Sequence, residues 1–116
     1  MGLPSVHRMT RSGEYAAVRA KGGSRSGRLM TLAYLAAEAP AAIRFGFTIT
    51  KRVGNAVHRN LLRRRLREIA RLASPAMQRT GQLVTIPRPL AAQATYAELA
   101  SEWHYLARKL RLLPET

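Results

Sequence analysis

The chain has 116 residues, which fits one domain, and 47% of them are hydrophobic, enough for a core. The formal net charge of +14 predicts a polyanionic partner, with nucleic acid ahead of an anionic membrane surface. All six acids are scattered Glu residues, which disfavours a nuclease that holds two metal ions on its own side chains, and the lack of Cys excludes disulfides and thiolate zinc sites.

The amino-terminal third predicts an irregular segment, a short helix and a strand. Residues 1–11 are irregular and basic, with no stretch that resembles a signal peptide, so a cytoplasmic location is expected. Ser12 is a plausible N-cap for a helix over 13–21 that Gly22 and Gly23 would stop. A loop over 22–27 then leads to a strand over 29–36 and a turn over 37–42.

The segment IRFGFTITK (43–51) alternates between apolar and polar residues. Ile43, Phe45, Phe47 and Ile49 fall on one face, which is typical of a half-buried strand. This strand runs directly into GNAVHRNLLRRRLREIAR (54–71), which holds six arginines and one acid.

The basic segment predicts an amphipathic helix over about 56–73, closed by Pro75. Gly54 and Asn55 would supply the turn and the N-cap. On a helical wheel, Leu62, Leu66, Ile69 and Ala73 form one face, and Arg59, Arg63, Arg67 and Arg71 run along the opposite side with Asn60 and Arg64 beside them. Arg65 points near the apolar arc, where it either snorkels or pairs with Glu68.

The carboxy-terminal third predicts a strand over 82–87 and a last helix. Thr95 and Glu98 match a capping box, and the helix that follows places Leu99 and Trp103 on one stripe before Pro114 ends it. The order α-β-β-(β)-α-β-α predicts the α+β class: a single domain, with a small four-stranded mixed sheet packed by helices on one face as a two-layer sandwich.

Like charges spaced four residues apart destabilise an isolated helix, whereas phosphates along the same face would reverse that effect. Three interpretations of this face remain open: an RNA-binding face, a solvated amphipathic helix, and a membrane-surface helix. The chain has only three lysines among its twenty basic residues, and the planar guanidinium of Arg suits phosphate and bases. GC-rich coding is an equally good explanation of that ratio, but it does not explain the net charge.

The segment RFGFTITKRVGNAVHRNLLRRRLREIAR (44–71) closely resembles the signature of the bacterial ribonuclease P protein subunit. That family has a strand ending in Ser/Thr-Lys-Lys/Arg, then Val/Ile-Gly-x-Ala-Val-x-Arg-Asn, then basic residues at helical spacing. Residues 8–22 and 83–99 resemble the family more loosely. The chain departs from the pattern at Leu61, where the family usually has Arg, at Arg19, where it has a second aromatic, and at Ala33, where it has a strand aromatic.

The resemblance implies a protein cofactor of a catalytic RNA. The holoenzyme would remove the 5′ leader of precursor tRNA, as an endoribonuclease whose chemistry belongs to the RNA and to Mg²⁺ held mainly by the RNA and the substrate. One protein is expected per RNA, with no membrane partner, no protein metal ligand and no catalytic side chain. The implied RNA-binding residues are Lys51, Arg52, Arg59, Asn60, Arg63, Arg64, Arg67, Arg71 and Arg88, and the implied leader-binding residues are Tyr15, Arg19 and Phe47.

Several of these residues have a second interpretation. Asn60 either binds RNA or hydrogen-bonds nearby backbone, Tyr15 either stacks on a leader base or sits at the edge of the core, and Arg88 either contacts phosphate or is solvated. Two other functions stay open: a non-enzymatic RNA-binding protein of ribosomal type, and a stand-alone nuclease, which the missing carboxylates disfavour.

Overall fold

The computed structural model describes residues 23–36 and 42–114. Its elements in chain order are β1 (Gly23–Ser26), β2 (Met30–Ala36), β3 (Arg44–Phe47), the 3-10 turn η2 (Lys51–Val53), α2 (Ala56–Ala73), the turn η3 (Ser74–Ala76), β4 (Gly81–Pro87), the turn η4 (Pro89–Gln93) and α3 (Tyr96–Lys109). Neither of the two helices in these residues is long and apolar enough to cross a membrane.

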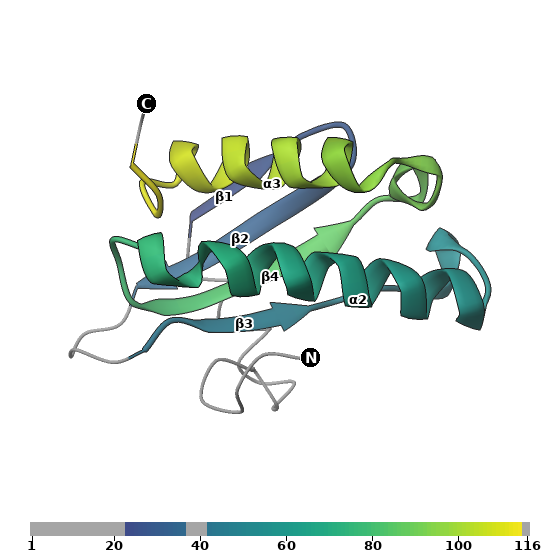
Figure 1. The fold of residues 1–116 in the computed structure, drawn as a ribbon, viewed down its shortest axis with the longest axis horizontal. Coiled ribbons are helices and arrows are strands. Elements are labelled where there is room, and N and C mark those ends of the chain that lie inside the picture. The colour runs from purple at the N-terminus through teal and green to yellow at the C-terminus, as the bar shows by residue number, and fades with distance from the viewer. Residues whose placement is uncertain (1–22, 37–41, 115–116) are drawn as a thin grey trace.

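The four described strands form one mixed sheet in the order β1-β2-β4-β3. β2 pairs antiparallel with both β1 and β4, whereas β3 runs parallel to β4. A parallel pair cannot be closed by a hairpin, and here the connection from β3 to β4 contains α2. The basic helix is therefore the crossover of the parallel pair, and it lies along the sheet beside α3 (Figure 1).

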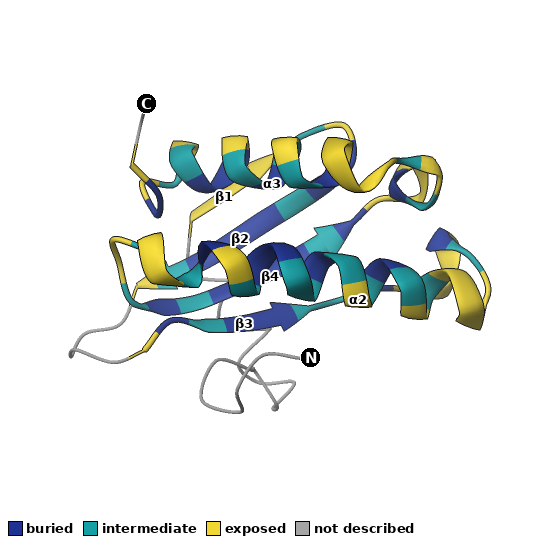
Figure 2. Ribbon diagram, in the orientation of Figure 1, coloured by how far each residue is buried: buried dark blue, intermediate teal, exposed yellow. Residues whose placement is uncertain are grey.

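Both helices cover the same face of the sheet, and the main core lies between the two layers (Figure 2). Trp103 of α3 is fully buried there, with its ring centroid 6.3 Å from that of Phe45 on β3. Its indole Nε1 donates a hydrogen bond to Oγ1 of Thr85 at 3.1 Å, so the polar atoms of this pair are satisfied inside the core. The predicted α+β class and two-layer arrangement are confirmed.

Two predictions differ from the structure by more than one residue, and the predicted helix over 13–21 lies outside the described residues. Residues 23–26, predicted as a loop, form edge strand β1, whose backbone pairs with β2 and whose Ser26 hydroxyl bonds that of Thr31 at 2.8 Å. β3 ends at Phe47 instead of reaching residue 51. The alternation continues beyond it, because Ile49 is still buried, but the chain turns at η2 to enter α2.

Both helices begin at the caps that the sequence predicts. Asn55 Oδ1 accepts a hydrogen bond from the backbone N–H of His58 at 2.9 Å, and α2 spans the predicted range. At α3, Oγ1 of Thr95 accepts from the N–H of Glu98 at 3.1 Å, and the Glu98 carboxylate accepts from the N–H of Thr95 at 2.8 Å. This reciprocal pair is a complete capping box.

The capping box makes stability depend on pH. The hydrogen bonds from Thr95 hold the pKa of the Glu98 carboxyl below its ordinary value of 4.5, so the unfolded chain takes up this proton first. The stability that the carboxylate contributes is present above pH 4.5 and is lost as the pH falls through the lower pKa of the folded state. We therefore expect Glu98→Gln to be less stable than the parent chain at pH 6. The difference in free energy of unfolding between the two should become smaller toward pH 3. Urea unfolding at several pH values measures this, and a gap that is constant with pH would contradict it.

The turn between β1 and β2 is fixed to α3 by Glu102. Its carboxylate accepts hydrogen bonds from three consecutive backbone N–H groups, those of Arg28 at 3.1 Å, Leu29 at 2.7 Å and Met30 at 2.9 Å. The approach requires a glycine at position 27, because a Cβ there would lie 2.6 Å from the carboxyl carbon of Glu102. This contact ties the edge of the sheet to the last helix.

Candidate nucleic-acid interface

The orientation of α2 is set by its apolar face and by Arg65. Leu62, Leu66 and Ile69 point into the core, and Arg65 Nη1 donates to the backbone carbonyl of Ala94 at 3.5 Å, just before α3. Arg65 therefore occupies the flank of α2 that faces α3. The arginines at 59, 63 and 67 lie on the other flank, because positions two residues apart on a helix are separated by about 200°.

This row of arginines, called here the arginine flank (Arg59, Arg63, Arg67), starts beside the core rather than opposite it as the sequence predicted. All three residues are half-buried, and Nε of Arg59 is fully enclosed. The reason is geometric, since steps of four residues advance the side chain by about 40° past a full turn. The flank therefore begins at the border of the core at Arg59, and Arg71, the next residue at this spacing, lies at the outer surface.

Asn60 lies next to this flank and holds one of its members. Arg63 Nη1 donates a hydrogen bond to Asn60 Oδ1 at 3.1 Å, and Asn60 and Arg64 are both exposed. Asn60 therefore orients a guanidinium through its side chain. Phosphate oxygens are suitable acceptors for the remaining guanidinium N–H groups of Arg63 and Arg64.

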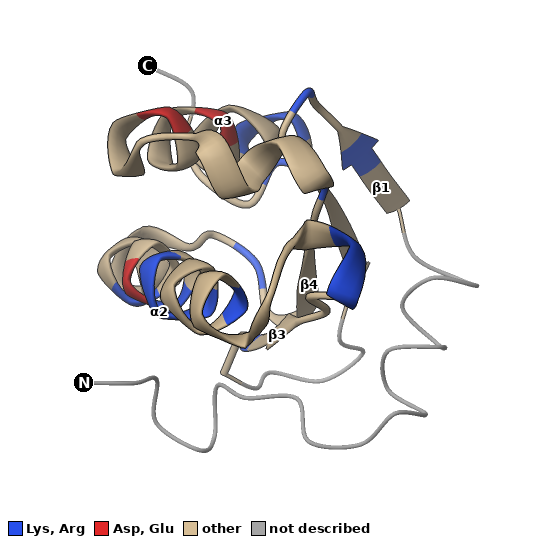
Figure 3. Cartoon of the chain, turned by 90° about the vertical axis from the view of Figure 1, so that its right-hand side faces the viewer, with Lys and Arg blue, Asp and Glu red and all other residues tan. Residues whose placement is uncertain are grey.

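The one acid on α2 pairs with the last arginine of the row. Glu68 Oε1 accepts from Arg71 Nε at 3.0 Å, and this hydrogen bond holds the pKa of the Glu68 carboxyl below its ordinary value. Glu68 therefore pairs with Arg71 and not with Arg65, which was the alternative raised by the sequence. Arg71 is thereby partly neutralised, whereas α2 carries no other acid to oppose its other arginines (Figure 3).

The structure also brings together two basic residues that are far apart in the sequence. Arg52 of η2 and Arg88 before η4, both exposed, line one pocket of about 380 Å³. Thr31 and Ile86 add a side from the sheet, on the face turned away from the helices. The sequence predicted a role for Arg52 and Arg88 but not for Thr31 and Ile86. These last two alternate with the core positions of β2 and β4, and that alternation is visible in the sequence. Lys51 is exposed beside Arg52.

The predicted leader-binding residues are only partly placed. Tyr15 and Arg19 lie outside the described residues. Phe47 is half-buried and packs against the main core. Next to the 380 Å³ pocket, on the same sheet face, Ala33 and Val84 form a small second apolar cluster, against which Ile86 of the pocket wall packs.

Among residues 23–36 and 42–114, no group of three His, Cys, Asp or Glu side chains could hold a metal ion. The carboxylates of Glu68, Glu98 and Glu102 are each engaged by hydrogen bonds, with Arg71, Thr95 and the β1–β2 turn. These three side chains do not fit a magnesium site built by the protein alone.

Comparison with known proteins agrees with this arrangement. The family model for Ribonuclease P matches residues 3–111. The chain is 41% identical to the ribonuclease P protein component of Acidothermus cellulolyticus, covering 93% of this chain and 91% of that protein, and 30% identical to that of Alkaliphilus metalliredigens, covering 96% and 99%. Its fold is similar to the solved RNase P protein of Staphylococcus aureus, with a TM-score of 0.86 at 19% identity over 93% of this chain and 98% of that one. The chain therefore belongs to the ribonuclease P protein family, and this membership makes it a protein component of an endoribonuclease complex that has an RNA subunit and acts in tRNA processing.

Proposed function

We propose that the chain binds the catalytic RNA of ribonuclease P through the arginine flank of α2 together with Asn60, Arg64 and Lys51. The observation that carries this proposal is the charge balance on α2, whose single acid, Glu68, is taken up by Arg71. Arg63, bonded to the neutral Asn60, and the exposed Arg64 present guanidinium groups on the outer side of the helix, and phosphates along the helix would offset the repulsion between them.

We propose further that the single-stranded 5′ leader of precursor tRNA passes the pocket shared by Arg52 and Arg88. Two guanidinium groups with threonine hydroxyls beside them suit a phosphate backbone. Tyr15 and Arg19 are proposed to contact the leader as well, with a base stacked on Tyr15. Phe47 packs against the core on the helix side of the sheet, opposite the pocket, so its expected contact with the leader does not fit this path.

In this proposal the bond cleavage belongs to the RNA subunit, and the protein positions the two RNA molecules. Mg²⁺ would supply charge stabilisation for phosphodiester hydrolysis and is proposed to be held mainly by the RNA subunit and the substrate; the engagement of Glu68, Glu98 and Glu102 by hydrogen bonds supports this. The complex is proposed to contain one protein per RNA and to act in the cytoplasm.

Reconstitution tests the proposal. The purified chain, a bacterial ribonuclease P RNA and precursor tRNA are combined at low Mg²⁺ and near-physiological salt. We expect cleavage at the 5′ end of the mature tRNA to be faster than with RNA alone. No acceleration over RNA alone would refute the proposed function, and cleavage by the protein without RNA would show that the polypeptide itself carries the chemistry.

A further inference from the structure

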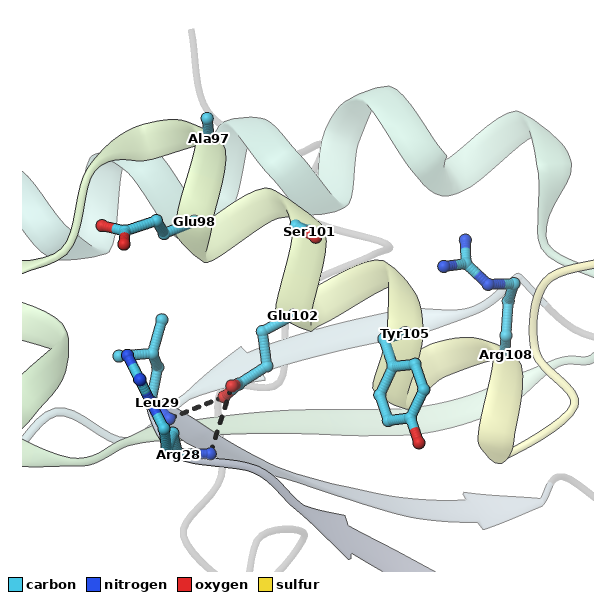
Figure 4. A pocket seen from close by; sticks show the side chains of 8 residues that line it. All are labelled: Arg28, Leu29, Ala97, Glu98, Ser101, Glu102, Tyr105 and Arg108. Carbon is cyan, nitrogen blue, oxygen red and sulfur yellow. Dashed lines mark hydrogen bonds between the residues drawn. The ribbon is translucent and has the colours of Figure 1, made fainter.

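A second pocket lies on α3, against the β1–β2 turn (Figure 4), and no residue of α2 lines it. Its volume is about 540 Å³. Arg28 stands at one end and Arg108 at the other, with Ser101 and Tyr105 of α3 between them. A smaller pocket of about 140 Å³ shares Arg28 and continues to the exposed Leu90 of η4. The two pockets together are called here the α3 groove.

The wall of the groove is built by the contact between Glu102 and the turn. Because the carboxylate of Glu102 binds the N–H groups of residues 28–30, the backbone that carries Arg28 is held against α3 (Figure 4). Gly27 permits this approach. The position of Arg28 at the groove is thus determined by the fold.

Three positive side chains lie at the groove, Arg28 and Arg108 in its lining and Lys109 beside Tyr105, against the two carboxylates of Glu98 and Glu102. Glu102 keeps its negative charge but directs it at three backbone amides of the turn, and Oε1 of Glu98 accepts from the N–H of Thr95. Arg28 adds to the hydrogen bonds from Thr95 in lowering the pKa of Glu98. In the described part of the chain, neither Arg28 nor Arg108 makes an ion pair, so both can accept an anionic ligand.

Tyr105 gives the groove an exposed aromatic surface. Tyr105 is 53% exposed, and Lys109 Nζ lies 5.3 Å from its ring centroid. An exposed ring flanked by cations is the combination that single-stranded nucleic acid uses, with bases stacked on the ring and phosphates at the basic side chains.

We propose that the α3 groove binds a short single-stranded RNA segment, with a base stacked on Tyr105 and phosphates at Arg28 and Arg108. Leu90 would offer an apolar surface for a neighbouring base. The chain would then hold RNA at two separate surfaces, the arginine flank and the α3 groove. An acidic peptide is the competing occupant, but it would not need an exposed ring between two guanidinium groups.

The test must resolve the groove from the arginine flank, because both surfaces attract RNA. The full chain, labelled with ¹⁵N, is titrated with hexauridylate, and NMR shifts are followed at the amides of Arg28, Ser101 and Tyr105. We expect saturable shifts there that persist in Arg63→Gln/Arg67→Gln, since that variant alters only the flank. Inorganic phosphate and a glutamate-rich peptide are titrated in parallel.

Matched variants define the contribution of each side chain. Tyr105→Leu should weaken hexauridylate binding at the groove about fivefold or more, because it removes the stacking surface, whereas Tyr96→Leu at the start of α3 should not. Arg28→Gln and Arg108→Gln should each make the slope of log K against log salt shallower by about 0.7. Arg111→Gln removes the same charge outside the groove. It should leave the slope of log K against log salt unchanged when binding is followed at the amides of Arg28, Ser101 and Tyr105.

Four outcomes would overturn the proposal. These are the absence of shifts at the groove, equal affinity for inorganic phosphate, tighter binding of the glutamate-rich peptide, and an unchanged affinity in Tyr105→Leu. Reconstituted cleavage activity is measured separately from binding at the groove. A groove without RNA affinity would therefore not contradict the proposed function of α2. Failure of the reconstitution would likewise not change the interpretation of the NMR titration.

Discussion

The double replacement Arg63→Gln/Arg67→Gln is expected to weaken binding to ribonuclease P RNA about a hundredfold, because each side chain contributes a charge-assisted contact to phosphate. If the α2 surface neutralises about five phosphates, log K against log salt should have a slope of about −4 for the parent chain. In the variant the slope should be shallower by about one to two. Filter binding or fluorescence anisotropy across a salt series measures both quantities.

The matched control for this variant is Arg65→Gln. Arg65 lies on the same helix, but its guanidinium reaches the carbonyl of Ala94 on the flank that faces α3. The control should therefore leave the salt slope unchanged. Thermal melts of all variants establish that they are folded. Equal slopes for the parent chain and the double variant would show that the arginine flank is not the RNA contact.

Glu102→Ala is expected to lower the free energy of unfolding by about 3 kcal/mol, since it removes the shared acceptor of three backbone N–H groups. Leu29 and Met30 are buried, so water cannot readily replace the carboxylate there. Equilibrium urea unfolding at neutral pH measures the change.

Two further variants show whether the turn contact is the cause. Glu102→Gln keeps an acceptor oxygen without the charge, so it should lower the free energy of unfolding clearly less than Glu102→Ala does. Gly27→Ala should destabilise the parent chain, because the new Cβ displaces the carboxylate, but should cost much less in the Glu102→Ala background. If Gly27→Ala costs the same in both backgrounds, its effect arises from the backbone and not from the contact with Glu102.

The sequence predicted α2 and α3 well because caps and the spacing of apolar residues can be recognised within a short segment. The range of α2 follows from Asn55 at its start and from the spacing of Leu62 and Leu66, and α3 follows from the capping box at Thr95. The apolar alternation that includes Phe45 likewise placed a strand before the basic helix. Each of these features depends on residues within a few positions of one another.

The features that the sequence did not predict depend on distant residues. β1 has no apolar side chain to signal a strand, and it exists because β2 offers a free edge for backbone pairing. Glu102 meets the turn more than seventy residues earlier in the chain. The pocket of Arg52 and Arg88 likewise needs the sheet order to be known. Roles of individual residues toward RNA remain predictions, because they concern a molecule outside the fold.

The position of α2 as the crossover between β3 and β4 has a thermodynamic consequence. The apolar face of α2 shares one core with Phe45 of β3 and Leu83 of β4, so unwinding the helix would expose the side chains that hold the two strands together. A polyanion that binds the wound segment but not the extended chain therefore favours the native state by mass action. Binding of a polyanion to the outer surface of α2 and folding of the sheet beneath it are therefore thermodynamically coupled.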